Sequence, residues 1–306
     1  MLTSLLPVFR LLLLGIGLLS AGAALAQSSG SQAAKSASKA VGKPPKTALA
    51  TPGCPAPAPT PAVARLLAEA RRLQADYHES EALGKYERVL AKDPATYAAL
   101  WEAAVLSVRI GSRYTDETRK LAYLAAARLY AKTALTVCPD GAEAHYAAGL
   151  ALATLAPLLP LRSRLLAYRE LRPHAYRATE LRPDWAEAWQ LLGRWQYRVD
   201  HYSLPERLYS KLFLGGMPVG GSTLLAVESL RKAYELAPQR IEHAYDLARV
   251  YLNRSQETRA TAVLQAALGI TPVTADELVM SRRCERLLEQ LNRRKRRQLQ
   301  RLINEL

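Results

Sequence analysis

The sequence predicts an all-α fold, a solenoid in which pairs of helices stack into a superhelix with insertions. Three observations predict it. Apolar residues follow a helical period almost without a break from about residue 62, prolines interrupt that period, and small residues recur at fixed distances from those prolines. The composition, 49% apolar and 23% charged, is that of a folded chain. A solenoid also suits 306 residues, because its core grows with every added repeat.

The repeat becomes visible when the helix-ending prolines are aligned, and these are Pro94, Pro139, Pro183, Pro238 and Pro272. Ten residues after each of the first four lies a small residue: Ala104, Gly149, Gly193 and Ala248. Five residues before each of the last four lies an alanine: Ala134, Ala178, Ala233 and Ala267. The last interval is 34 residues, the tetratricopeptide period, whereas the others are 45, 44 and 55. We therefore expect insertions near residues 110–120, 154–168 and 198–221.

Local signatures of the repeat agree with this period. Trp189-Gln190-Leu191-Leu192-Gly193 reproduces the W-x-x-L-G of the tetratricopeptide repeat, and Ala82 with Tyr86 reproduces its A-x-x-x-aromatic before Pro94. A small residue lets the two helices of a pair approach closely, and proline, which has no N–H, separates one helix from the next. The pattern predicts a tetratricopeptide-type domain over residues 62–280.

One longer stretch is similar to a particular family. Leu191-Leu192-Gly193-Arg194-Trp195-Gln196-Tyr197 is followed by Leu204-Pro205-Glu206-Arg207, Leu212-Phe213-Leu214-Gly215 and Pro218. This series resembles the regulator of microtubule dynamics family, tetratricopeptide-type proteins with an insertion after the LLGRW motif, and the likeness covers about residues 64–284. The resemblance implies the fold and an interaction role. Animal members are associated with microtubules and organelle membranes; we expect a bacterial-type exported relative and do not transfer the microtubule activity to it.

The N-terminus predicts export. In residues 1–26 the only charge is Arg10, an apolar stretch follows it, and Ala24-Leu25-Ala26 forms a small-residue cleavage site before Gln27. We expect a signal peptide cleaved near Ala26-Gln27 and a periplasmic or secreted protein. The alternative is an uncleaved membrane anchor, but the apolar run of 16 residues is shorter than the roughly 20 that span a bilayer.

Composition also divides the rest of the chain. Residues 27–61 are rich in Ser, Ala, Lys and Pro and have little large apolar surface, which predicts a disordered linker. Without Arg10 the net charge of +15 becomes +14, compatible with an anionic membrane, an acidic peptide or nucleic acid. Export makes nucleic acid the least expected of these partners, and we predict none.

No pattern of catalytic or metal-binding residues is present. The five histidines are spread along the chain without an H-E-x-x-H, and the sequence has neither G-x-S-x-G nor a phosphate loop ending in G-K-[ST]. His145 and His243 occupy nearly equivalent repeat positions, which favours packing over ligation. Cys54, Cys138 and Cys284 form no C-x-x-C, so either one pair or three free thiols are expected. We predict a non-enzymatic protein without metal or cofactor.

The repeat register places a set of polar and aromatic side chains on the concave surface, because the first helix of each pair lines it. The expected groove residues are Trp101, Arg109, Tyr146, Glu187, Gln190, Arg194, Tyr197, Arg198, Tyr245, Arg249 and Asn253. Arginine binds carboxylates with two parallel N–H groups, and tyrosine adds rigid contact area. This predicts binding of a protein or extended peptide partner through an anionic group. The alternative is that Arg194 and Arg249 pair with Glu187 and Glu242 on their own helices.

The C-terminal segment, residues 281–306, predicts a basic amphipathic helix. Its basic run is Arg293, Arg294, Lys295, Arg296 and Arg297, and leucines recur around it at three- and four-residue steps. A capping helix with a polar outer face explains this pattern, and adhesion to anionic lipid explains it as well. The second functional hypothesis is therefore a lipid- or membrane-surface-binding module, in which this helix acts with the apolar insertions at 155–161 and 212–214.

Overall fold

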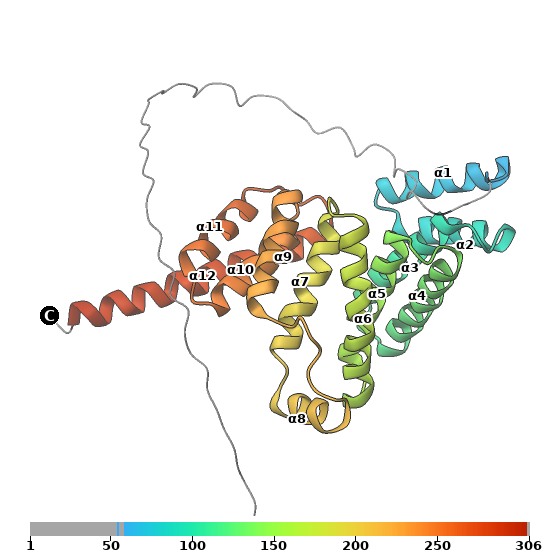
Figure 1. Ribbon diagram of the computed structural model, residues 1–306. Helices are drawn as coiled ribbons and strands as arrows, with labels where there is room; N and C mark the ends of the chain where they lie inside the picture. The colour runs from blue at the N-terminus through green and yellow to red at the C-terminus, as the bar shows by residue number, and fades with distance from the viewer. Residues whose placement is uncertain (1–53, 55–57, 305–306) are drawn as a thin grey trace, which may run out of the picture. The chain divides into compact units, whose positions relative to one another are not determined.

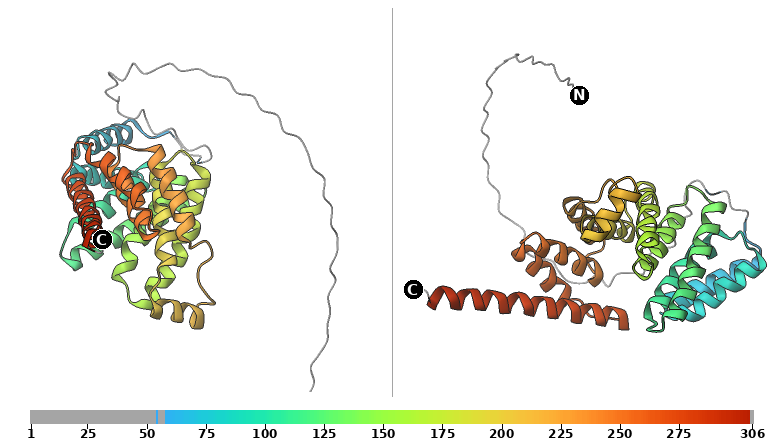
Figure 2. Two further views of the ribbon diagram at one scale, coloured as in Figure 1. Left: turned by 90° about the vertical axis from the view of Figure 1, so that its left-hand side faces the viewer. Right: turned by 90° about the horizontal axis from the view of Figure 1, so that it is seen from below.

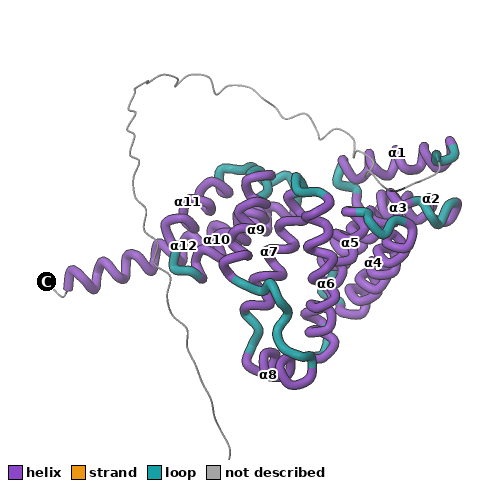
Figure 3. The backbone as a smooth tube through the Cα atoms, in the orientation of Figure 1, coloured by secondary structure: helices purple, strands orange, loops and turns teal. Residues whose placement is uncertain are grey.

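The computed structural model describes Cys54 and residues 58–304, and all regular elements of that part are helices (Figure 1, Figure 3). The predicted signal peptide, 1–26, and most of the predicted linker, 27–61, lie outside the described residues. The prediction of an all-α, helix-pair solenoid is confirmed.

Five helix pairs follow one another within the described residues, and one long helix completes them. The pairs are α1 (Pro61–Ala75) with α2 (Glu79–Lys92), α3 (Tyr97–Arg113) with α4 (Glu117–Val137), α5 (Ala142–Leu155) with α6 (Leu161–Leu181), α7 (Ala186–Asp200) with α9 (Thr223–Leu236), and α10 (Ile241–Asn253) with α11 (Glu257–Leu268). The long helix is α12 (Ala275–Asn304). A single 3-10 turn (Ala156–Leu158) precedes α6, and α8 (Leu204–Phe213) lies between α7 and α9.

The aligned prolines lie just past the second helix of a pair. α4, α6 and α9 end at Val137, Leu181 and Leu236, each two residues before its proline. In these turns the residue before the proline still donates its backbone N–H to the helix, as Cys138 does to the carbonyl of Ala134 at 2.8 Å. Proline cannot donate, so the helical ladder stops there and the next first helix begins.

The small residues at the tenth position occupy the contact between helices. A Cβ atom on Gly149 would come within 2.9 Å of Leu191 Cδ2, and one on Gly193 within 2.6 Å of Leu230 Cγ. Ala104 and Ala248 are fully buried at the corresponding places. The recurrence seen in the sequence is therefore the recurrence of close helix approach.

The chain curves so that the start of its last helix, α12, approaches the second helix pair. In the right-hand view of Figure 2 the helix pairs follow an arc, and α12 runs across it. The first turn of α12 reaches α3, where Arg113 donates through Nε and Nη2 to Asp276 at 2.9 and 2.6 Å. Two buried residues, Cys284 and Leu291, then pack α12 on α10 and α11. Beyond Leu291 the described side chains of α12 are exposed.

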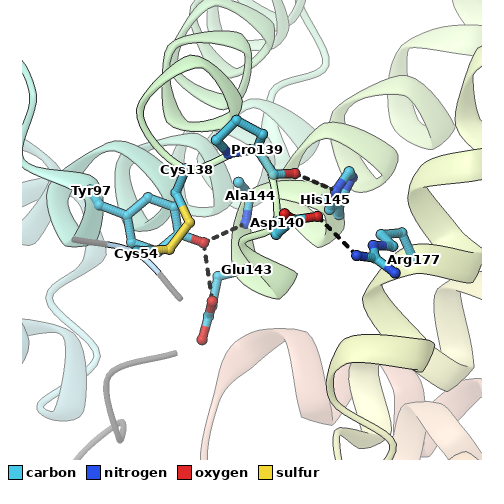
Figure 4. Close-up of a disulfide and its surroundings, with 9 residues drawn as sticks. All are labelled: Cys54, Tyr97, Cys138, Pro139, Asp140, Glu143, Ala144, His145 and Arg177. Carbon is cyan, nitrogen blue, oxygen red and sulfur yellow. Dashed lines mark hydrogen bonds and ion pairs between the residues drawn. A yellow bond between two sulfur atoms is a disulfide. The ribbon is translucent and has the colours of Figure 1, made fainter. Parts of the chain in front are cut away.

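A disulfide joins Cys54 to Cys138 at the start of the turn after α4, with their Cα atoms 5.4 Å apart (Figure 4). Beside it the hydroxyl of Tyr97 donates to Glu143 at 3.1 Å and accepts the N–H of Ala144 at 3.1 Å. Cys284 is a buried free thiol. Of the two expectations left open by the sequence, the structure has the single pair.

The first of the two apolar insertions is part of the core. Leu155 and Ala156 are buried, and Leu158, Leu159 and Leu161 are half-buried against the core of α5 and α6. This insertion therefore does not present the lipid-facing surface expected of it. None of the helices within residues 58–304 combines the length and the hydropathy that crossing a bilayer requires.

Candidate partner-binding groove

Side chains from α3, α5, α7 and α10 converge on one surface. Burial opposes the charge of Arg194 on α7, but the carboxylates of Asp246 and Glu242 outweigh this effect and raise the pKa of its guanidinium. Burial likewise opposes the charge of Arg109 on α3, but Tyr146, Glu79 and Glu242 outweigh it and raise the pKa. Both arginines thus feel the Glu242 carboxylate of α10, so first helices of separate pairs share one electrostatic environment.

Arg194 is bound to Asp246 rather than to a carboxylate of its own helix. Its Nε donates to Asp246 Oδ2 at 2.5 Å, and the Gln190 amide donates to the same oxygen at 2.8 Å. The Asp246 side chain is 10% exposed, whereas that of Arg194 remains 43% exposed. The sequence left open an ion pair between Arg194 and Glu187 of the same helix, and the structure shows an ion pair with Asp246 of α10 instead.

Arg109 is neutralised from the other end of the groove. Its Nη1 donates to Glu79 of α2 at 3.3 Å, and Arg113 contacts the second oxygen of that carboxylate at 2.6 Å. Arg249 has no acidic partner among the described residues and lies over the ring of Tyr245, 5.7 Å from its centroid. The pairing of Arg249 with Glu242 that the sequence left open does not occur.

Tyr197 and Arg198, predicted for the groove, belong to other contacts. Arg198 donates to Glu206 of α8 at 2.5 Å and lies 5.1 Å from the ring centroids of Tyr168 and Tyr202. Tyr197 stacks on His201 at 4.1 Å. The end of α7 therefore supports the α8 insertion through Arg198, and the role of Tyr197 and Arg198 in partner binding stays a prediction.

The other predicted groove residues differ in exposure. Tyr146 is buried and packs on Trp185 with ring centroids 4.5 Å apart, and Trp101 is half-buried beside the same core. Asn253 is exposed. Glu187 and Glu242 are half-buried, and neither makes a hydrogen bond or ion pair within the described part of the chain. Glu242 nevertheless interacts electrostatically with Arg109 and Arg194.

Glu79, Asp246 and Trp185 were missed by sequence reasoning. Asp246 lies four residues after Glu242, so helical spacing places both on one face of α10 and could have suggested it. Glu79 lies on a second helix, α2, and Trp185 lies just before α7, so a register of first-helix positions includes neither of them.

The predicted basic run does not join this surface. Arg293, Arg294, Lys295, Arg296 and Arg297 lie on the exposed end of α12, which projects away from the helix pairs (Figure 1). Arg293 donates to Glu289 one turn earlier at 3.1 Å. This segment is a solvated helix in the structure.

Two surface clefts lie elsewhere. One of about 640 Å³ is enclosed by α6, α9 and the side of α7 that carries Trp189, Leu192 and Gln196. The other, of about 500 Å³, lies beside His145, Arg172 and Pro139. Neither cleft is lined by Arg109, Arg194 or Glu242, so both are separate from the groove. An experiment on partner binding must therefore distinguish the groove from the clefts.

The histidines adjoining the second cleft are engaged in packing. His145 Nε2 donates to the carbonyl of Pro139 at 2.9 Å, so its Nδ1 accepts the Nδ1–H of His174 at 3.0 Å. At the equivalent position one repeat later, Trp189 donates to the carbonyl of Pro183 at 2.8 Å. The position is thus a recurring helix-start contact. Within the described residues no three His, Cys, Asp or Glu side chains gather as a metal site would require.

Comparison with known families decides the relationship. Residues 66–292 match the family model described as Regulator of microtubule dynamics protein 1-3. The chain belongs to the regulator of microtubule dynamics family. Among curated members, it is 25% identical to regulator of microtubule dynamics protein 3 of Bos taurus over 190 residues, covering 61% of this chain and 40% of that protein. The Mus musculus protein is 24% identical over 225 residues, covering 70% and 47%.

The chain spans less than half the length of these family members, so their whole-protein activities do not transfer directly. Among solved structures, a thermophilic tetratricopeptide-repeat protein of Thermus thermophilus aligns with a TM-score of 0.53 and 19% identity, covering 72% of this chain and 98% of that one. This likeness shows the fold: the regulator of microtubule dynamics domain is built here as tetratricopeptide-type helix pairs.

Proposed function

We propose that the protein is a non-enzymatic scaffold that binds an extended segment of a protein partner on the surface formed by α3, α5, α7 and α10. One observation carries the proposal: side chains of these helices converge there, and Arg109 and Arg194 stay 42% and 43% exposed although carboxylates surround them. A row of half-exposed polar groups on rigid helices suits an extended peptide segment, because such a segment presents its backbone and side chains along its length.

The charges of the surface define what the segment offers. Arg194 is neutralised by Asp246, and Arg109 with Arg113 is neutralised by Glu79 and Asp276. A single anionic group is therefore not the main determinant. The half-buried carboxylates of Glu187 and Glu242, together with Arg249 and Asn253, support a segment that presents both hydrogen-bond donors and acceptors.

We place this function in the cell envelope. The signal-like residues 1–26 support export, and so does the Cys54–Cys138 disulfide, because disulfides persist in oxidising compartments and are rare in reducing ones.

The test separates the groove from the 640 Å³ cleft. Arg194→Ala is a poor probe, because it leaves the nearly buried Asp246 with the Gln190 amide as its remaining described partner. We therefore use Glu187→Gln with Glu242→Gln and Arg249→Gln. The matched control is Glu228→Gln with Lys232→Gln, which lie on the wall of the cleft.

The three full-length proteins are compared by affinity capture from native cell envelopes, with quantitative mass spectrometry of what is retained. We expect one protein partner to be captured by the wild type and the cleft variant and lost from the groove variant, at equal melting temperatures. A partner lost only from the cleft variant would show that the binding surface lies between α6 and α9 instead.

A further inference from the structure

Helix α8 buries polar residues and exposes apolar ones. Its polar residues Glu206 and Ser210 are 3% and 0% exposed, whereas Leu204, Leu208 and Leu212 are 82%, 59% and 66% exposed. A surface helix of a folded protein ordinarily buries its apolar stripe and exposes its polar side. In α8 this arrangement is reversed. The exposed leucines therefore suit contact with an apolar partner rather than with water.

A set of hydrogen bonds holds the polar side inward. Glu206 accepts from Arg198 at 2.5 Å, and its second oxygen accepts from the backbone and the hydroxyl of Ser203 at 2.8 and 3.0 Å. Burial opposes the charge of Glu206, but Arg198 outweighs it and lowers the pKa of the carboxyl. The helix cannot rotate to hide its leucines without breaking the hydrogen bonds of this ion pair.

The loop after α8 is fixed in the same way. Ser210 donates to the carbonyl of Gly216 at 2.6 Å, and Arg169 of α6 donates to the same carbonyl. Arg172 donates to the carbonyl of Val219 at 2.8 Å. These contacts join the insertion to α6, so α8 is presented on a rigid support.

The exposed apolar residues form one patch. Leu204, Leu208 and Leu212 follow at four-residue steps and therefore share a face of the helix, and Phe213, 67% exposed, ends it. α8 lies at an extremity of the structure, below the helix pairs in Figure 1. Contiguous apolar surface of this kind marks an interaction site in a soluble protein.

The charged residues beside the patch indicate which kind of partner it would bind. Arg207 and Lys211, each one position before a leucine, border the stripe and are exposed, and Arg207 donates to the carbonyls of Tyr202 and Asp200 at 2.8 Å. The single acid of α8, Glu206, is buried and paired, and Arg162 at the start of neighbouring α6 is exposed as well. An apolar stripe edged by cations is the pattern of helices that lie in the surface of anionic membranes.

We propose that α8 docks on an anionic lipid bilayer, with Leu204, Leu208 and Leu212 entering the acyl boundary. Lys211 then extends toward the lipid phosphates, as cationic side chains do at such interfaces, and the charge of Arg207 lies beside it. This surface is separate from the groove of α3, α5, α7 and α10, and the inference does not depend on the proposed scaffold function.

The experiment measures local amide hydrogen exchange in the full chain with vesicles of equal parts phosphatidylcholine and phosphatidylglycerol. The charge of the basic end of α12 would attract such vesicles as well, so the exchange of residues 204–213 is the deciding readout. We expect vesicles to slow exchange there by about tenfold, because bound lipid suppresses the local opening of the helix. Vesicles of phosphatidylcholine alone are expected to have little effect.

The test variant is Leu208→Asp with Leu212→Asp, and the matched control is Leu129→Asp, an equally exposed leucine on α4 at 64%. The test variant should lose the protection of residues 204–213 and keep wild-type exchange elsewhere, whereas the control should keep the protection. Exchange in α8 that is unchanged by anionic vesicles overturns the proposal. So does a lipid-independent dimer in light scattering that the test variant abolishes, because the patch then binds a second copy.

Discussion

Gly193 of α7 lies directly against Leu230 of α9, and a Cβ atom on it would come within 2.6 Å of Leu230 Cγ and 3.2 Å of its backbone nitrogen. Leu230 is fully buried, so neither its side chain nor its backbone has room to retreat. The glycine of the LLGRW motif is thus the point at which the first and second helices of the fourth pair touch.

Gly193→Ala should destabilise the protein. Alanine gains about 1 kcal/mol of helix propensity, but overpacking against Leu230 costs about 1–3 kcal/mol, so the net change is a loss. Urea unfolding followed by circular dichroism measures it. The control is Gly84→Ala on α2, where a Cβ meets nothing within 4 Å, and this variant should gain about 0.5–1 kcal/mol. Equal stabilities for the two variants would contradict the close contact.

Loss of the Cys54–Cys138 disulfide should lower the free energy of unfolding. The bond joins residues 84 positions apart, and a loop of that length is expected to contribute about 2–4 kcal/mol, chiefly by restricting the unfolded chain. Wild type in reductant and the double variant Cys54→Ser with Cys138→Ser should show the same reduced stability. Reductant should leave the double variant unchanged.

The third cysteine supplies an internal check on that measurement. Burial raises the pKa of the Cys284 thiol to about 11, so alkylation should label it only after unfolding. Rapid alkylation of three thiols in the native protein would show that the disulfide is absent.

The contribution of His174 to stability should fall as the pH is lowered from about 6.5. Burial, and then the neighbouring His145, lower the pKa of His174 from 6.5 to about 4. Between pH 6.5 and about 4 the unfolded chain therefore binds a proton at this histidine that the folded chain does not bind. The free energy of unfolding then falls by up to about 1.4 kcal/mol per pH unit as the pH is lowered. Urea unfolding at pH 7, 6 and 5 measures the slope. The slope should be smaller for the His174→Gln variant. It should be the same as wild type for the control variant His201→Gln, in which the replaced histidine is exposed.

The contribution of Glu102 to stability should depend on pH in the opposite direction to that of His174. Burial on α3 raises the pKa of its carboxyl from 4.5 to about 7, although the Gln74 amide donates to it at 3.0 Å. The folded chain holds this proton more tightly, so its contribution to stability is present at low pH and lost as the pH rises through 7. Glu102→Gln, whose amide oxygen can still accept from Gln74, should gain about 1–2 kcal/mol at pH 8 and almost nothing at pH 4, below the unfolded pKa of 4.5. A gain of equal size at both pH values would show that the carboxyl is not protonated in the fold.

The fold could be predicted because its determinants are periodic along the chain. A proline ends a helix wherever it occurs, and a small residue ten positions later always meets the same neighbouring helix, as Gly149 and Gly193 do. The groove could be predicted in part for the same reason. Arg109 and Arg194 share a surface as expected, but Arg198 leaves it because the inserted α8 supplies Glu206 as a partner.

The sequence by itself determined the stacking of helix pairs, the first-helix positions that carry the arginines, and the presence of an apolar insertion after the LLGRW motif. The tertiary structure alone decided that Arg194 binds Asp246 of another pair, that Cys54 joins Cys138, and that α8 exposes its leucines. The reason is physical. Backbone periodicity sets which face of a helix a residue occupies, whereas partners 52 or 84 residues apart are set by the curvature of the whole array.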